Sequence, residues 1–242
     1  MRAVLLLLAF VTVALPAESR RRAAGRGPAL VTIQDDFRNG QLGWVADFAD
    51  YSPASAPTME LDAGMRPLPP ELGTPGTGFF LTGHNRSDDL FMFLAKKLTQ
   101  ADGILPRQAY ELTFRIVLAS NAGSHCIGAG GAPGESVYLK AGATGTEPQV
   151  SLDDSNHYQV NFDKANQSQS GMEVSVAGDI ANGTSDCSGD APFVSIERTH
   201  RHAQPVTSSP FGEIWLIVGT DSGFEGKTTL YYQEVEAALT PR

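Results

Sequence analysis

Three short polar segments carry most of the side chains in this sequence that suit ligand binding. They are residues 47–51, 85–89 and 221–225. Asn and Asp side chains can hold neighbouring hydroxyl groups, arginine can donate to them, and an aromatic ring can stack on a sugar. We therefore expect a site for carbohydrate or a related extracellular ligand. Its candidate residues are Trp44, Asp47, Asp50, Tyr51, Asn85, Arg86, Asp88, Asp89, Tyr138, Lys140, Asp221 and Glu225.

The same segments also suit ordinary turns, because Asp, Asn and Ser side chains bond to nearby backbone amides. The two interpretations differ in whether the three segments lie close together in the folded chain. A joint site requires at least two of the segments to meet at one end or edge of the fold. It also requires Arg86 to lie within about 12 Å of Asp221 or Glu225, since charges farther apart are screened.

Carboxylates are frequent enough to make calcium the candidate cofactor, with a structural role. Hard oxygen ligands suit this ion, and they stand at Asp35, Asp36, Asp88, Asp89, Asp221 and Glu225. None of these sets has the spacing of a dedicated calcium loop, so the metal position stays unassigned. Free surface carboxylates are the alternative.

A polysaccharide-active enzyme is the second functional class. Glu135, Asp221 and Glu225 offer the paired carboxylates that glycoside hydrolysis needs, although their separation decides that chemistry. No other combination of residues indicates a nucleophile with its base. The sequence favours a non-catalytic module, and a surface or matrix adhesion protein is the third class.

The elements that must position these residues are short strands. Apolar or alternating runs bounded by Gly, Pro, Asn and Asp predict an all-β, antiparallel β-sandwich of jelly-roll type, with a closed barrel as the alternative. The last two runs, around a glycine-rich connection, predict a hairpin with a long loop. Residues 53–75 are expected to be mostly loop. The expected strands are 31–37, 59–61, 78–82, 90–98, 110–118, 136–141, 157–162, 172–177, 193–197, 214–218 and 228–232.

The N-terminus has the pattern of a secretory signal peptide. Residues 1–17 comprise a basic start, an apolar run and a small-residue end. The apolar run is short for a membrane span, so a single-pass anchor is the minor alternative. Residues 18–28 are expected to be a disordered basic leader, and residues 29–242 a single β-sandwich domain. The mature protein is then secreted, periplasmic or extracellular, without a membrane span.

The net charge excludes some classes of binding partner, and the two cysteines predict a covalent link within the chain. The formal net charge of −9 argues against nucleic acid and against anionic membrane surfaces. Cys126 and Cys187 are the two cysteines, and export predicts a disulfide between them with Cα atoms within about 7 Å. A two-cysteine zinc site is the weaker alternative.

Several strings resemble known families. Residues 37–44, 97–99, 105–106, 110–116 and 228–235 are similar in order and spacing to jelly-roll, galactose-binding-like carbohydrate-binding modules. Residues 85–93, 134–142 and 219–226 resemble a family of uncharacterised exported bacterial proteins. The resemblance implies the sandwich fold, export and a polysaccharide or other extracellular ligand, and permits a structural calcium ion.

A second resemblance concerns Tyr138 and Lys140. The string Tyr138-Leu-Lys-Ala-Gly resembles a strand of jelly-roll alginate lyases, in which tyrosine moves the proton of β-elimination. The partner motifs of that family are absent from this sequence. A solvent-facing cluster of Tyr138, Lys140 and Arg86 is what the lyase hypothesis requires.

Overall fold

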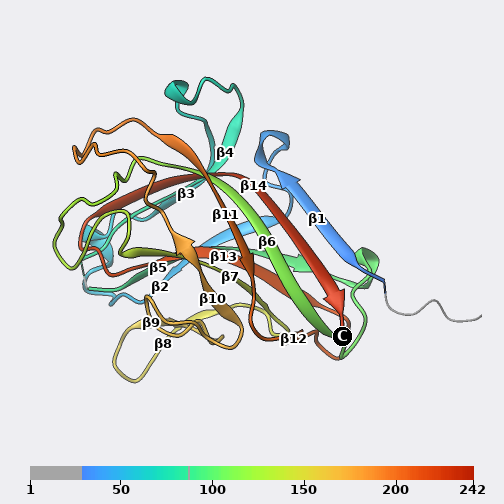
Figure 1. Cartoon of the computed structure of the whole chain (residues 1–242). Coiled ribbons are helices and arrows are strands. Elements are labelled where there is room, and N and C mark those ends of the chain that lie inside the picture. The colour runs from blue at the N-terminus through green and yellow to red at the C-terminus, as the bar shows by residue number, and fades with distance from the viewer. Residues whose placement is uncertain (1–28, 87) are drawn as a thin grey trace, which may run out of the picture.

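The computed structural model describes residues 29–86 and 88–242; the expected signal peptide and leader lie outside these residues. Two antiparallel sheets pack face to face as a jelly-roll β-sandwich (Figure 1). Sheet A has the order β11 (Val194–Arg201), β6 (Ala109–Ser120), β14 (Lys227–Pro241), β4 (Thr77–His84) and β3 (Asp62–Pro67), with β1 (Val31–Asp36) on β14 and β12 (Val206–Thr207) on β6. Sheet B has the order β10 (Val174–Asp179), β7 (Val137–Thr144), β13 (Ile214–Ser222), β5 (Leu90–Leu98) and β2 (Trp44–Ala49).

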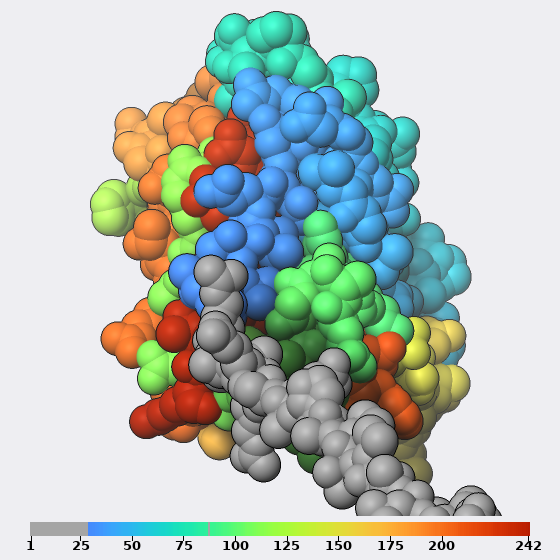
Figure 2. Space-filling view, turned by 90° about the vertical axis from the view of Figure 1, so that its right-hand side faces the viewer, coloured from blue at the N-terminus to red at the C-terminus, as the bar shows by residue number. Residues whose placement is uncertain are grey.

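Three smaller features complete the described fold. The short strands β8 (Val150–Leu152) and β9 (Tyr158–Val160) pair as a separate ribbon. Single 3-10 turns are η1 (Phe37–Asn39), η2 (Ala56–Thr58), η3 (Pro70–Leu72) and η4 (Gln100–Asp102). Strand β1 pairs with β14, and in the space-filling view blue atoms of the N-terminal part adjoin red atoms of the C-terminal part (Figure 2).

Alternation builds the main core between the sheets. Strand β6 buries every second side chain, from Tyr110 to Leu118, as its period of two predicts. Its partner β14 buries Leu230 and Tyr232, then changes register at a bulge before Val235. The bulge keeps the apolar side chains on the inner face although β14 is 15 residues long.

Most expected strands are confirmed. Strand β5 has the expected bounds, and most of the others lie within a few residues of prediction. Two expectations were wrong. The strand expected at residues 59–61 begins instead at Asp62, and residues 44–49, which were not predicted as a strand, form β2 on the edge of sheet B.

The expected hairpin at residues 214–232 was also wrong. Strand β13 belongs to sheet B and β14 belongs to sheet A, so the connection between them crosses from one layer to the other. Strand β13 also extends through Asp221 and Ser222, which the sequence placed in the loop. The reason is that β13 pairs with β5 and β7 along its whole length, up to Ser222.

Sheet B carries a second, smaller core on its outer face. Strand β5 sends Leu90, Met92 and Leu94 into the main core and Phe91 and Phe93 to the opposite side. The outer phenylalanines pack with Phe162, from the chain between β9 and β10. We call residues 161–173 the covering segment. Because it buries the outer face, β5 is apolar on both sides, which explains its continuous run of hydrophobic residues.

The disulfide prediction is confirmed. Cys126 and Cys187 are bonded, with their Cα atoms 5.5 Å apart. The bond joins the chain between β6 and β7 to the chain between β10 and β11.

Among the described residues, no helix has the length and apolar character needed to cross a membrane.

Candidate functional site

The three polar segments meet at one end of sheet B. Asp50 follows β2, Asp89 precedes β5 and Asp221 lies near the end of β13. Because these strands are neighbours in the order β13-β5-β2, carboxylate oxygens of the three residues fall within 4.8 Å of one another. Lys140 of β7 and Lys164 of the covering segment complete what we call the charge cluster.

Lys164 is the central cation of the charge cluster. Its Nζ lies 2.6 Å from Asp50 Oδ2 and 2.9 Å from Asp221 Oδ2. It also donates to the Ala165 carbonyl at 3.2 Å and lies 5.0 Å from the centre of the Phe91 ring. The side chains of Lys164 and Asp50 are only 7% and 3% exposed, so these contacts form in a largely water-free environment.

Lys140 makes a complete set of contacts for an ammonium group. Its Nζ donates to the carbonyls of Lys164 at 2.7 Å and Gln169 at 3.0 Å, and lies 2.9 Å from Asp221 Oδ2. The side chains of Lys140 and Asp221 are fully buried. Lys140 therefore holds the covering segment onto sheet B and supplies a counter-charge to Asp221.

The protonation states of its three acids and two lysines balance the charges within the charge cluster. Burial and the neighbouring Asp221 carboxylate raise the pKa of Asp89 to about 9, so this carboxyl is protonated at neutral pH. Burial also raises the pKa of Asp50 and lowers the pKa of Lys140. Burial opposes ionisation of Asp221 too, but Lys164 and Lys140 lower its pKa overall. Two ammonium groups then face two carboxylates and one neutral acid.

The carboxylates of Asp50, Asp89 and Asp221 form an acidic group that could hold a metal ion. Lys164 already contacts Asp50 Oδ2 and Asp221 Oδ2, and Lys140 also contacts Asp221 Oδ2. The Gln167 backbone N–H donates to Asp221 Oδ2 at 3.0 Å. Calcium requires six to eight oxygen ligands. Lys164 and a calcium ion would compete for Asp50 and Asp221.

Arg86 does not take the expected place in this cluster. Its side chain is exposed and lies 4.0 Å from Glu60, while Lys140 and Lys164 pair with Asp221. Lys164 was missed because nothing in its local sequence distinguishes it from a surface lysine. Only the fold of the covering segment brings it onto the outer face of sheet B.

Two other residues that were expected to bind ligand instead make hydrogen bonds that stabilise the fold. Trp44 is fully buried and donates through Nε1 to Asp35 Oδ2 at 2.8 Å, so its ring has no face free for stacking. Asn85 is also buried, and its Nδ2 donates to the carbonyls of Ser222 at 2.9 Å and Phe224 at 3.1 Å. Asn85 thus holds the connection between β13 and β14 in place.

The remaining candidates lie closer to solvent. Asp47, Asp88 and Glu225 are exposed, and Tyr51 and Tyr138 are half-buried. The solvent-facing cluster that the lyase hypothesis requires is not assembled, since Lys140 is buried and Arg86 pairs with Glu60 instead. Asp35 and Asp36, considered above as calcium ligands, contact Lys96 and Arg38 respectively.

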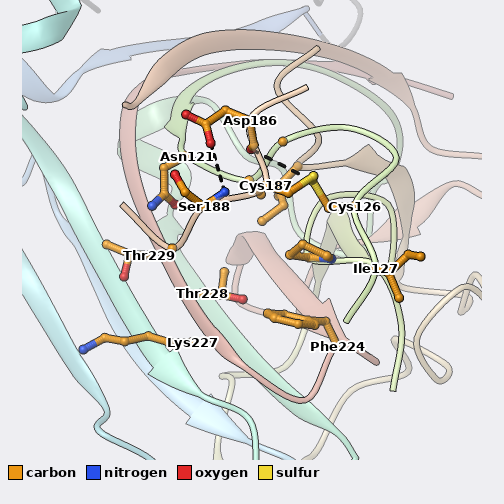
Figure 3. Close-up of a pocket in the computed structure, with 15 residues that line it drawn as sticks. Asn121, Cys126, Ile127, Asp186, Cys187, Ser188, Phe224, Lys227, Thr228 and Thr229 are labelled. Atoms are coloured by element: carbon orange, nitrogen blue, oxygen red, sulfur yellow. Dashed lines mark hydrogen bonds between the residues drawn. A yellow bond between two sulfur atoms is a disulfide. The ribbon is translucent and has the colours of Figure 1, made fainter. Parts of the chain in front are cut away.

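A solvent-accessible pocket lies beside the disulfide, and we call it the disulfide pocket (Figure 3). Its volume is about 190 Å³. Phe224 and Ile127 form one side of it, and Thr229 and Lys227 of β14 lie opposite. Polar groups around the remainder come from Asn121, Asp186 and Ser188. None of these residues was predicted from the sequence to contact a ligand.

Phe224 is held by close backbone contacts. A Cβ atom added to Gly128 would lie 2.4 Å from the ring, and one added to Gly226 would lie 2.1 Å from it. Glycine at both positions therefore lets the chain approach the half-buried ring. The only available sequence signal was this single aromatic residue in a glycine-rich connection.

Polar contacts also shape the pocket wall. The Ser188 backbone N–H donates to Asp186 Oδ1 at 2.9 Å, and Lys227 Nζ donates to Glu60 Oε2 at 2.8 Å. Ser188 side-chain and backbone hydrogen bonds lower the pKa of Asp186, which keeps this exposed carboxyl ionised. The pocket therefore combines an apolar side with a carboxylate, an amide and hydroxyl groups.

No protein-family model matches the chain, and no curated protein matches it in sequence. Among solved structures, the K1 cleaved adhesin domain of Lys-gingipain from Porphyromonas gingivalis W83 is similar, with 14% identity, TM-score 0.38, and coverage of 85% of this chain and 96% of that domain. The carbohydrate-binding module TmCBM27, described for mannan recognition, has 8% identity, TM-score 0.39, and coverage of 87% and 98%. TmCBM61, solved with β-1,4-galactotriose, has 9% identity, TM-score 0.34, and coverage of 84% and 92%. Matches at this level carry no inference about the ligand of this chain.

Proposed function

We propose that the protein is an exported, non-catalytic module that binds carbohydrate in the disulfide pocket. The observation that carries this proposal is the composition of the pocket, where the Phe224 ring faces hydroxyl, amide and charged groups. Sugars present apolar ring faces and polar edges, so a site for them needs both kinds of surface. The charge cluster, being buried, supports the connection that carries Phe224.

The individual roles follow from side-chain chemistry. Phe224 stacks on the face of a sugar ring, Asp186 accepts hydrogen bonds from hydroxyl groups, and Asn121 and Ser188 both donate and accept. Lys227 lines the edge of the pocket with its aliphatic chain, because its ammonium group pairs with Glu60. The cavity of about 190 Å³ is smaller than the roughly 300–1,000 Å³ of typical small-molecule sites. We therefore propose that a single sugar unit or a chain end enters it.

Export is part of the proposal. The signal-peptide pattern supports it, and so does the disulfide, because such bonds persist in oxidising compartments. The net charge of −9 suits an extracellular partner other than nucleic acid.

A glycan array followed by calorimetry tests the binding proposal. Phe224→Ala should weaken binding by about tenfold or more, which corresponds to about 1.4 kcal/mol for a lost stacking contact. Phe224→Leu keeps apolar packing and separates loss of stacking from loss of folding. The matched control is Phe211→Ala, because Phe211 is 74% exposed and precedes the opposite end of β13. Equal binding by wild type and Phe224→Ala, or no glycan bound at all, would refute the proposal.

Calcium is the cofactor to test at the charge cluster. Thermal unfolding with added calcium and with a chelator measures whether an ion stabilises the fold. A midpoint that rises with calcium supports a structural ion that displaces Lys164 from Asp50. An unchanged midpoint supports the two lysines as the counter-charges of this site.

A further inference from the structure

Lys164 and Asp50 form an unusually enclosed pair of reactive groups. The amine nitrogen lies 2.6 Å from Asp50 Oδ2, and both side chains are more than nine-tenths buried. Water is therefore largely kept away from this contact.

We propose that Lys164 and Asp50 condense to form an intramolecular amide bond that fastens the covering segment to the end of β2. The pair already has the proximity that intramolecular reactions need. Burial opposes the charge of Lys164, but the Asp221 and Asp50 carboxylates raise its pKa overall. The amine must therefore pass a proton to Asp50, whose pKa is raised by burial, before it can act as a nucleophile. Phe91 lies beside the amine and lowers the polarity of its surroundings.

The low-polarity surroundings favour this reaction. Two buried charges carry a desolvation cost of several kcal/mol each, and their attraction repays it only in part. An amide removes both charges at once. Lys140 and Asp221 remain as an ion pair at 2.9 Å, so the charges stay balanced after condensation.

The step balances without an oxidant or a cofactor. Lys164 starts as an ammonium ion and Asp50 as a carboxylate. Nζ releases one proton to the carboxyl group, and its lone pair attacks Cγ. The C–O bond of the tetrahedral intermediate then breaks, and the oxygen leaves as water with that proton and a second proton from Nζ. Asp89, whose carboxyl oxygen lies within 4.8 Å of that of Asp50, relays the protons.

The neighbouring pair is a poorer candidate. Lys140 donates to two backbone carbonyls and contacts one carboxylate, that of Asp221, whereas Lys164 donates to one backbone carbonyl and contacts two carboxylates. Asp221 Oδ2 likewise accepts from Lys164 and from the Gln167 backbone N–H. Attack on Asp221 requires several of these contacts to break first.

Peptide mapping by mass spectrometry tests the proposal on the full-length chain. The expected result is a linked pair of peptides, one containing Asp50 and one containing Lys164, lighter by one water molecule than their sum. The link should survive reduction, which distinguishes it from the disulfide. Separate, unmodified peptides from the folded protein would overturn the proposal, and so would a link at Lys140.

Substitutions at Lys164, Lys140 and Asp89 test the role of each residue in forming the amide link. Lys164→Arg keeps the positive charge but cannot condense, so its linked peptide should be absent, whereas Lys140→Arg should retain the link. Asp89→Asn should slow the appearance of the link after refolding by at least tenfold, and an unchanged rate would remove Asp89 as the relay. If Lys164→Arg fails to fold, the wild-type peptide map still decides the question.

Discussion

The charge cluster and the disulfide pocket lie close together along the chain but differ in almost every physical respect. Asp221 ends its strand inside the charge cluster, and Phe224 lines the pocket shortly afterwards. The cluster concentrates charge in a buried place, whereas the pocket is accessible and mixes ordinary polar groups with one aromatic ring. The segments richest in polar residues therefore build the buried charge cluster that supports the fold, whereas less polar segments build the accessible pocket.

The largest expected effect comes from removing the shared carboxylate of the cluster. Asp221→Ala leaves the fully buried Lys140 without its counter-charge, whether or not Lys164 is linked to Asp50, which should lower the free energy of unfolding by about 3–5 kcal/mol. Urea unfolding followed by tryptophan fluorescence measures this loss. Asp47→Ala serves as the control, because Asp47 is exposed. A loss below about 1 kcal/mol would contradict a supporting role for the cluster.

The next effect should fall on the pocket. Replacing both Cys126 and Cys187 by serine removes the link between two segments of its wall, and should lower the free energy of unfolding by about 2–4 kcal/mol. We also expect glycan affinity to fall, because these segments carry Asn121 and Ser188. Calorimetry on variants that remain folded measures the affinity. Unchanged affinity would show that the disulfide stabilises the fold without shaping the pocket.

Acid should affect the covering segment before it affects the pocket. Ser175 contacts His200 at 2.8 Å and His202 at 2.6 Å, and His202 Nε2 contacts the Met172 carbonyl at 2.9 Å. Burial lowers the pKa of His200 to about 4 and also lowers that of His202. The unfolded chain therefore binds more protons than the folded chain below about pH 6.5, and stability falls as the pH drops from there towards 4.

The size of this acid effect should be on the order of 1–2 kcal/mol for His200, since the ring remains partly solvated. Urea unfolding at a series of pH values measures it. His200→Gln should flatten the dependence, while His125→Gln should leave it unchanged because His125 is exposed. A steep dependence that persists in His200→Gln would assign it to other groups.

The smallest effect is expected at Arg86, which the sequence placed at the centre of the site. Its exposed contact with Glu60 at 4.0 Å should contribute less than about 0.5 kcal/mol to stability. Arg86→Ala should also leave glycan affinity unchanged, because Arg86 does not line the pocket. Parallel unfolding and calorimetry check both points, and a clear loss of affinity would extend the site beyond the disulfide pocket.

The sequence allowed prediction of features that depend on local pattern. Alternation located β6, and the continuous apolar run located β5, because side-chain direction repeats every two residues. Two cysteines, together with the expected export, were enough to predict the disulfide that the structure contains. The polar density of residues 47–51, 85–89 and 221–225 correctly indicated that these segments belong together, although their meeting place is buried rather than open.

Only the tertiary structure decided the contacts between distant segments. Whether β13 and β14 formed a hairpin or joined different sheets depended on pairing with β5, β7, β4 and β6, which local pattern does not specify. Lys164 gained its role when the covering segment folded over sheet B, and Phe224 gained its pocket when the disulfide brought two other segments beside it. Burial and long-range pairing belong to the whole chain, so neither can be read from the residues next to Lys164 or Phe224.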